Sequence, residues 1–415
     1  MINLKSHNEL LPHLFREEYT KMTAVLCRHF GLNHLEIAED IASDTFLKAS
    51  EHWAINGVPE NPTAWLYTVA KNKTKDYFKR LSIFETKIKM EIDIPQQEYN
   101  FEFNNEVITD SQLAMIFAVC NPNNSAESQI CLALQILCGF SIEEISNAFL
   151  TKAETIKKRL LRARSNLRNN SFQIKRLNAT AIKSRLFTVL KTLYLLFNEG
   201  YFSVTNNQLV RKELCSEAVR LALVLTENQL TNTPETNALL ALMCFQSSRL
   251  EARTSDKGEI VLFDNQDKNL WDKSLIQRGN YYLSNATNGK EISKYHLEAG
   301  IAYWHTILKD DNKWKYILQL YNQLILIEYS PITALNRMFA FAKVYGNEKA
   351  IPEVEKLNLT AINYYQELLG YLYSDIEIDK AIEHYGKAIQ LTKSRSKKQA
   401  LKKEIERLDK IKGSY

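Results

Sequence analysis

The chain is poor in the two residues that most often interrupt helices. Its 415 residues include only 12 glycines and 8 prolines. Few stretches alternate Val, Ile or Thr with polar residues in the way that a half-buried strand does. This composition predicts an all-α protein, and a chain of this length is expected to form two or more domains.

Cysteine is also scarce, and its placement carries no pattern. The six cysteines form no C-x-x-C pair and no metal-ligand spacing with the scattered histidines. Buried thiols in a reducing compartment explain them best, so we expect no disulfide, no metal and no cofactor. The positions are Cys27, Cys120, Cys131, Cys138, Cys215 and Cys244.

Long hydrophobic runs and secretion signals are missing as well. The longest apolar block, Ile130 to Phe140, contains Gln135 and is far shorter than the ~20 residues that cross a bilayer. The first residues, MINLKSHNEL, lack the basic segment and following apolar run of a secretory signal. We expect a soluble, cytoplasmic protein with no membrane partner.

Sequence signatures of catalysis are absent too. The chain has no glycine-rich phosphate loop, no nucleophile elbow and no H-E-x-x-H pair. Polar residues of the C-terminal half, such as Glu199 and Asp267, are more simply helix-end and turn residues. We expect no catalytic residues and no enzymatic activity.

What the chain does contain is a segment with the layout of a helix-turn-helix, GFSIEEISNAFLTKAETIKKRLLRARSNLR, from residue 139 to 168. Ser141 and Glu144 form an S-x-x-E capping box, and Thr151 and Glu154 form a second, T-x-x-E, box. Two helix starts this close together predict a short turn. The second helix has one apolar face, formed by Ile156, Leu160, Ala163 and Leu167.

The same segment carries a local excess of positive charge. From Lys152 to Arg176 there are nine basic residues and one acid, whereas the whole chain is only +5. Such a helix suits the major groove of DNA, although a solvated basic face is the simpler alternative. The expected base contacts are Lys152, Glu154, Thr155 and Lys158; the expected phosphate contacts are Arg159 and Arg162, and Lys157 lies on the same stretch.

Two helical segments nearer the N-terminus have distinctive outer faces. Residues 37 to 50, IAEDIASDTFLKAS, place Asp40, Asp44 and Lys48 on one compact, mostly acidic face. Residues 65 to 80, WLYTVAKNKTKDYFKR, follow a loop with two prolines and interleave aromatic residues with lysines. Rings and cations of this kind can hold unstacked single-stranded bases, although aromatic residues at helical spacing are more often part of a core.

Taken together, the order of these motifs resembles the extracytoplasmic-function class of bacterial RNA polymerase sigma factors. The resemblance covers about Leu10 to Arg168 and implies two helical domains. The first would bind core RNA polymerase through Asp40, Asp44 and Lys48. It would also open and read the minus-ten element of promoter DNA as a single strand, through Lys71, Asn72, Lys75, Asp76 and Arg80.

The resemblance assigns a role to the remaining N-terminal segments. The loop from Asn56 to Thr63 matches the family's flipped-base pocket in location only, and the helix-turn-helix would read the double-stranded minus-thirty-five element. The expected domains are residues 1–88, a flexible acidic linker over 89–110, and the helix-turn-helix domain over 111–176. The turn at Asn121–Asn124 is expected to precede a supporting helix, Ala126–Cys138.

More than half of the chain follows as a succession of expected helices, and residues 177–415 are expected to form one regulatory domain. The last pair, YYQELLGYLYSDIEIDKAIEHYGKAIQL, resembles a degenerate tetratricopeptide repeat, with Gly370 and Tyr373 facing Ala381, Tyr385 and Ala388. Phrases such as LYLLFNEGYFS resemble a sigma-factor subgroup with a tetratricopeptide-like extension. That resemblance implies control of the protein by its own tail, where an unknown ligand or protein could bind.

Two alternative functions stay open at this point. A free-standing helix-turn-helix regulator could use the repeat domain for dimerisation or ligand binding, but it has no use for a polymerase-docking face. A repeat-based scaffold with incidental basic segments leaves the ordered N-terminal motifs unexplained.

Overall fold

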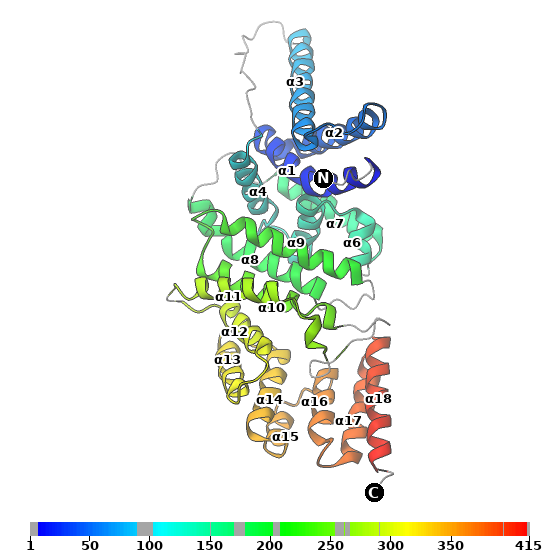
Figure 1. The fold of residues 1–415 in the computed structure, drawn as a ribbon, viewed down its shortest axis with the longest axis vertical. Helices are drawn as coiled ribbons and strands as arrows, with labels where there is room; N and C mark the ends of the chain where they lie inside the picture. The colour runs from blue at the N-terminus through cyan, green and yellow to red at the C-terminus, as the bar shows by residue number, and fades with distance from the viewer. Residues whose placement is uncertain are drawn as a thin grey trace. The chain divides into compact units, whose positions relative to one another are not determined.

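The computed structural model describes residues 7–88, 103–149, 151–169, 179–201, 208–253, 261, 266–289, 291–392 and 394–412. Within these residues every regular element is helical, which confirms the expected all-α class (Figure 1). The chain forms two compact units, one comprising residues 1–199 and 220–231 and the other residues 200–219 and 232–415.

The first unit begins with three long helices and a short 3₁₀ turn. Helix α1 packs against both α2 and α4, and Phe46 and Trp53 of α2 and Leu66 of α3 are buried between the helices. Gly57 ends α2 with a φ of 78°, a conformation that side chains disfavour. The bounds are α1 His7–Phe30, η1 Leu32–His34, α2 Leu35–Asn56 and α3 Pro62–Ile88.

The helix-turn-helix follows in the same unit. Helix α4 begins at Asn105, where the side chain of Asn104 accepts a hydrogen bond from the Val107 amide. The C-terminal end of the expected linker is therefore helical, because this cap starts a helix whose later residues are buried; residues 89–102 lie outside the described part of the chain. The bounds are α4 Asn105–Val119, α5 Ala126–Leu132, π-helical η2 Ala133–Leu137, α6 Ile142–Ala148 and α7 Ala153–Arg168.

Two helices of the C-terminal extension are shared between the units. Helix α8, Ala179–Tyr201, belongs to the first unit as far as Glu199. Helix α9, Gln208–Thr226, belongs to the first unit from Arg220 onward. The extension therefore does not start as a separate domain, because its first helices complete the unit that contains the helix-turn-helix.

The second unit is a succession of helices in which sequence neighbours pack together. Most helices expected from the sequence are present. The sequence predicts a helix over Glu235–Ala252, whereas α10 ends at Ser247, and α15 is a helix that the sequence did not predict. The bounds are α10 Pro234–Ser247, η3 Glu251–Arg253, η5 Lys268–Leu270, α11 Lys273–Ala286, α12 Lys294–Thr306, α13 Lys313–Ile327, α14 Pro331–Tyr345, α15 Asn347–Glu355, α16 Asn363–Tyr373, α17 Ile378–Leu391 and α18 Arg395–Lys412.

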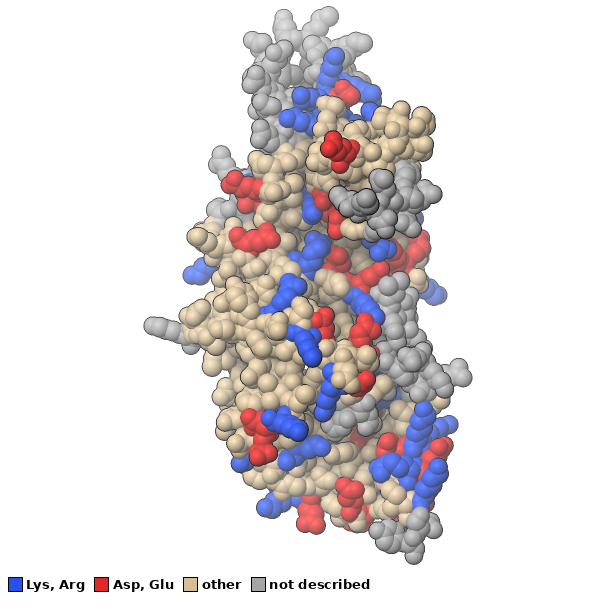
Figure 2. Space-filling view, viewed as in Figure 1, with Lys and Arg blue, Asp and Glu red and all other residues tan. Residues whose placement is uncertain are grey.

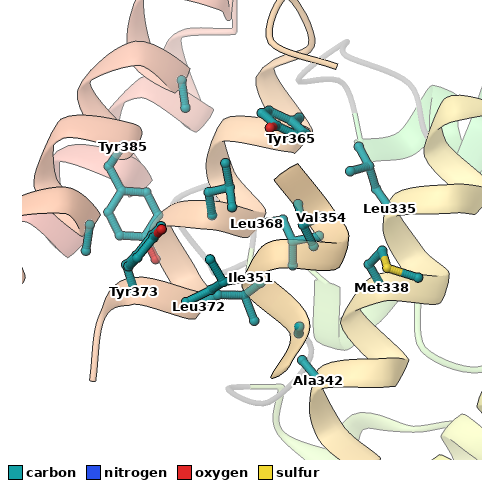
Figure 3. Packing of buried hydrophobic residues seen from close by; sticks show 14 of the residues in the cluster. Leu335, Met338, Ala342, Ile351, Val354, Tyr365, Leu368, Leu372, Tyr373 and Tyr385 are labelled. Atoms are coloured by element: carbon teal, nitrogen blue, oxygen red, sulfur yellow. The ribbon is translucent and has the colours of Figure 1, made fainter. Parts of the chain in front are cut away.

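The last helices share one apolar core. Tyr373 and Tyr385 fill the space between α16 and α17, as the sequence pattern predicts, and Leu335 and Met338 extend this core to α14 (Figure 3). Gly370 makes the close approach possible, because a Cβ atom there would lie 2.8 Å from the Tyr385 ring. Small and large residues thus alternate across the helix pair.

We expect Gly370→Ala to destabilise the second unit by about 1–3 kcal/mol, because the added methyl group overpacks the Tyr385 ring. Gly386→Ala in α17 is the matched control. Its Cβ would meet nothing within 4 Å, so the better helix propensity of alanine should leave stability equal or higher. Calorimetric unfolding of the full chain measures both variants, and equal melting temperatures would contradict the close-packing argument.

Candidate nucleic-acid interface

Helix α7 presents the expected DNA contacts to solvent. Lys152, Glu154, Thr155, Lys157, Lys158 and Arg162 are exposed, and Arg159 is half-buried. The opposite face is buried, as the sequence pattern predicts, through Ile156, Leu160, Ala163 and Leu167. The helix thus offers its N-terminal half and its cations to a partner while its apolar stripe holds it in the domain.

One of the two expected capping boxes forms. The Ser141 amide donates to Glu144 Oε2 at 2.8 Å, and the Glu144 amide donates to Ser141 Oγ at 3.2 Å. The second box was a wrong prediction: Lys152 is the N-cap of α7, and the Thr151 hydroxyl donates to the Phe149 carbonyl instead. Helix α7 begins one residue later than the box requires, so Thr151 precedes the N-cap.

The expected polymerase-docking residues lie on the open face of α2. Asp40, Asp44 and Lys48 are exposed, and Asp44 contacts Lys73 of α3 at 3.3 Å. Sequence reasoning missed that Leu47 (58% exposed) and Ile55 (84% exposed) lie unburied on this helix. Their spacing of eight residues places them on one side of the helix, and that spacing was the available signal. The face is therefore mixed, with carboxylates and aliphatic groups together.

Helix α3 carries the residues expected to read the minus-ten element. Asn72, Lys75, Asp76 and Arg80 are exposed and Lys71 is half-buried. In Figure 2, Lys and Arg side chains gather over the upper end of the first unit, where Figure 1 shows α3. This cationic surface suits a phosphate backbone.

The aromatic residues of this segment mostly serve the core. The Phe78 ring lies 5.1 Å from the Phe30 ring, and the Trp65 ring lies 5.4 Å from the buried Trp53 ring. Tyr67 is buried and donates to Glu18 Oε2 at 2.5 Å; burial, together with the nearby Glu18 charge, raises the pKa of Tyr67. These contacts favour the interpretation that the rings are part of the core over the interpretation that they stack on single-stranded bases.

A groove of about 700 Å³ lies between α1, α3, α4 and the end of α9. Its α3 side includes Thr68 and Lys71, and Asn61 and Thr63 come from the start of α3 and the preceding loop. Thr109 and Gln112 of α4 line the same groove. The loop that the sequence places at a base pocket therefore does border a hollow, but the helix-turn-helix domain contributes to the lining.

Ion pairs join the N-terminal helices to the helix-turn-helix domain within this unit. Arg164 of α7 donates from both terminal nitrogens to the Glu39 carboxylate, at 2.8 and 2.7 Å, and also to Gln135. Burial disfavours the charged guanidinium, but the hydrogen bonds and charge of Glu39 outweigh it and raise the pKa of Arg164. Arg168 pairs with Glu36 at 2.5 Å and Arg28 with Asp110 at 3.4 Å.

The comparisons with known proteins fit this geometry. Residues 14–82, from α1 to α3, match the family model of sigma-70 region 2. The N-terminal part of the chain is thus similar to sigma-70 region 2. It contains all the expected polymerase-docking and minus-ten residues, from Asp40 to Arg80.

Two relatives are similar to longer parts of the chain. The RNA polymerase sigma factor YlaC of Bacillus subtilis (strain 168) is 26% identical over 172 residues, which are 40% of this chain and 93% of YlaC. An uncharacterized protein of Rhizobium meliloti (strain 1021) is 29% identical over 392 residues, 92% of each chain. Residues 185–287 match a family of unknown function, DUF6596. No solved structure matches the chain.

Other kinds of site are not found in the described part of the chain. No group of three or more His, Cys, Asp or Glu side chains there is arranged to hold a metal ion. The helices there include none long and apolar enough to cross a membrane.

We expect Glu39→Gln to lower the stability of the first unit by about 1–3 kcal/mol, because Arg164 keeps its partly buried charge and loses its carboxylate. The matched control is Glu154→Gln, whose pair with Lys158 is long, at 3.9 Å, and well exposed, so its effect should stay within about 0.5 kcal/mol. Urea unfolding measures both. An unchanged midpoint for Glu39→Gln would show that the doubly hydrogen-bonded Arg164–Glu39 pair, the Arg164–Glu39 fork, adds no stability.

Proposed function

We propose that this protein is a sigma factor of the extracytoplasmic-function class, which binds core RNA polymerase and directs it to specific promoters. The observation that carries the proposal is the sigma-70 region 2 over α1–α3, followed in the same unit by a helix-turn-helix with an exposed basic helix. It has no enzymatic activity of its own. Promoter DNA and core polymerase are its partners.

Each helix has a distinct task in this proposal. Asp40, Asp44 and Lys48 on α2, with the aliphatic Leu47 beside them, dock on polymerase. The cations and amides of α3 capture the minus-ten strand, so that phosphate contacts offset the unstacking cost of a few kcal/mol per base step. The exposed half of α7 reads the minus-thirty-five element in the major groove.

The C-terminal extension is the regulatory part in this proposal. Its second unit is tetratricopeptide-like, with small and large residues interleaved between α16 and α17. A ligand or protein bound there would change transcription through the extension rather than through a separate inhibitor. A free-standing regulator is the second candidate. The exposed, mostly acidic face of α2 argues against it, because such a regulator has no use for a polymerase-docking face.

Charge reversal of the docking face separates these two functions. We expect Asp40→Lys with Asp44→Lys to weaken binding to core polymerase by about tenfold or more, because both carboxylates are exposed on the docking helix. Asp311→Lys with Asp375→Lys changes the net charge equally at exposed sites of the second unit and should bind normally. Co-purification with core polymerase and titration give the affinities; equal binding of both double variants would exclude α2 as the docking face.

The recognition helix can be tested by its salt dependence. The target duplex is first identified by run-off transcription on genomic fragments with purified core polymerase. We expect Lys158→Ala to cost ~1–3 kcal/mol if a base contact is lost, and Arg159→Ala to reduce the salt slope by ~1 if a phosphate contact is lost. Binding and salt slope unchanged in both variants would remove α7 from the interface.

A further inference from the structure

The first helix of the extension is built into the core of the helix-turn-helix domain. Arg185 of α8 donates to the Phe117 carbonyl near the end of α4, at 3.2 Å. Arg220 of α9 donates at 2.7 Å to the carbonyl of Leu137, which ends η2 just before the turn into α6. Both arginines thus bind carbonyls at helix ends that would otherwise lack partners.

A series of hydrogen bonds that is buried from Thr192 to Asn124 starts from the same helix. The Thr192 hydroxyl of α8 donates to Gln129 Oε1 at 2.6 Å. Gln129 Nε2 donates to the carbonyls of Asn121 and Asn124, each at 2.9 Å. Asn124 Oδ1 in turn accepts from Asn166 Nδ2 of α7 at 2.9 Å. This series of hydrogen bonds therefore connects α8 of the extension to the recognition helix α7.

The direction of these bonds is fixed by the Gln129 amide. Two carbonyl oxygens face one end of this amide, so that end must be the donating Nε2. Oε1 is then left to accept, and only a donor such as the Thr192 hydroxyl satisfies it. The hydroxyl also lies 2.9 Å from the Thr188 carbonyl of its own helix, but the bond to Gln129 is shorter and fills an otherwise unmet acceptor.

We propose that Thr192 is a positioning residue for the recognition helix, through which the extension controls reading of the upstream element. Thr192 orients Gln129, Gln129 holds the Asn121–Asn124 turn, and the turn holds α7 at Asn166. Helix α9 begins in the second unit and ends in the first, and α8 ends where the second unit begins, so a ligand-induced change there has a physical route to α7. This proposal rests on the proposed function, since it names how that function is regulated.

The test is a double-mutant cycle on binding to the upstream-element duplex. Thr192→Val keeps the shape and removes the donor, and we expect it to weaken DNA binding about five- to tenfold with unchanged affinity for core polymerase. Asn166→Ala should weaken binding similarly. If the two residues act through the same hydrogen bonds, the loss of affinity in the double variant should be at least about threefold smaller than the product of the two single losses. Thr192→Ser restores the hydroxyl and should restore binding.

Amide hydrogen exchange supplies a readout that does not need DNA. Thr192→Val should raise exchange in residues 121–124 and along α7 but not in α2, whereas an unspecific loss of stability would raise exchange throughout the first unit. Wild-type DNA affinity in Thr192→Val, purely multiplicative effects, or failure of Thr192→Ser to restore binding would overturn the proposal. If the wild-type chain binds neither polymerase nor promoter, the proposed function fails, and the exchange pattern still decides whether Thr192 positions α7.

Discussion

The C-terminal half of helix α4 is buried on every side, and this constraint organises the first unit. All residues from Leu113 to Cys120 are at most 1% exposed, so no single neighbour can cover the helix. Helix α1 covers it from the N-terminal region, and α8 reaches its end through Arg185. Segments that belong to three domains by sequence therefore share one core, because each depends on the others to shield the same apolar helix.

Burial also raises the free-energy cost of losing a polar contact in this unit. The Arg164–Glu39 fork and the Gln129 network lie in partly or fully buried surroundings, where an unmet partner costs more than in water. The fork joins α7 to α2, and the Gln129 network joins α7 to α8. Helix α7 is thus fixed by contacts to α2 and to α8. The side of the helix that carries most of the cations between Lys152 and Arg162 stays exposed.

The sequence predicted the local features well and the contacts between segments poorly. The Ser141–Glu144 box and the apolar stripe of α7 follow from short spacings, so they were predictable. The Thr151 cap failed because the preceding turn starts α7 one residue later, at the N-cap Lys152. Partners of Thr192 and Arg164 are far away in the chain, and no periodicity within one helix indicates which residue will face them.

By itself the sequence determined the helical class, the order of the motifs and the outer faces of α2, α3 and α7, because these depend on spacing within about two helical turns. Only the tertiary structure decided that the extension completes the helix-turn-helix domain and that α7 is paired with α2. The physical reason is that burying α4 and matching buried donors with acceptors are requirements on the whole unit, which distant segments meet together.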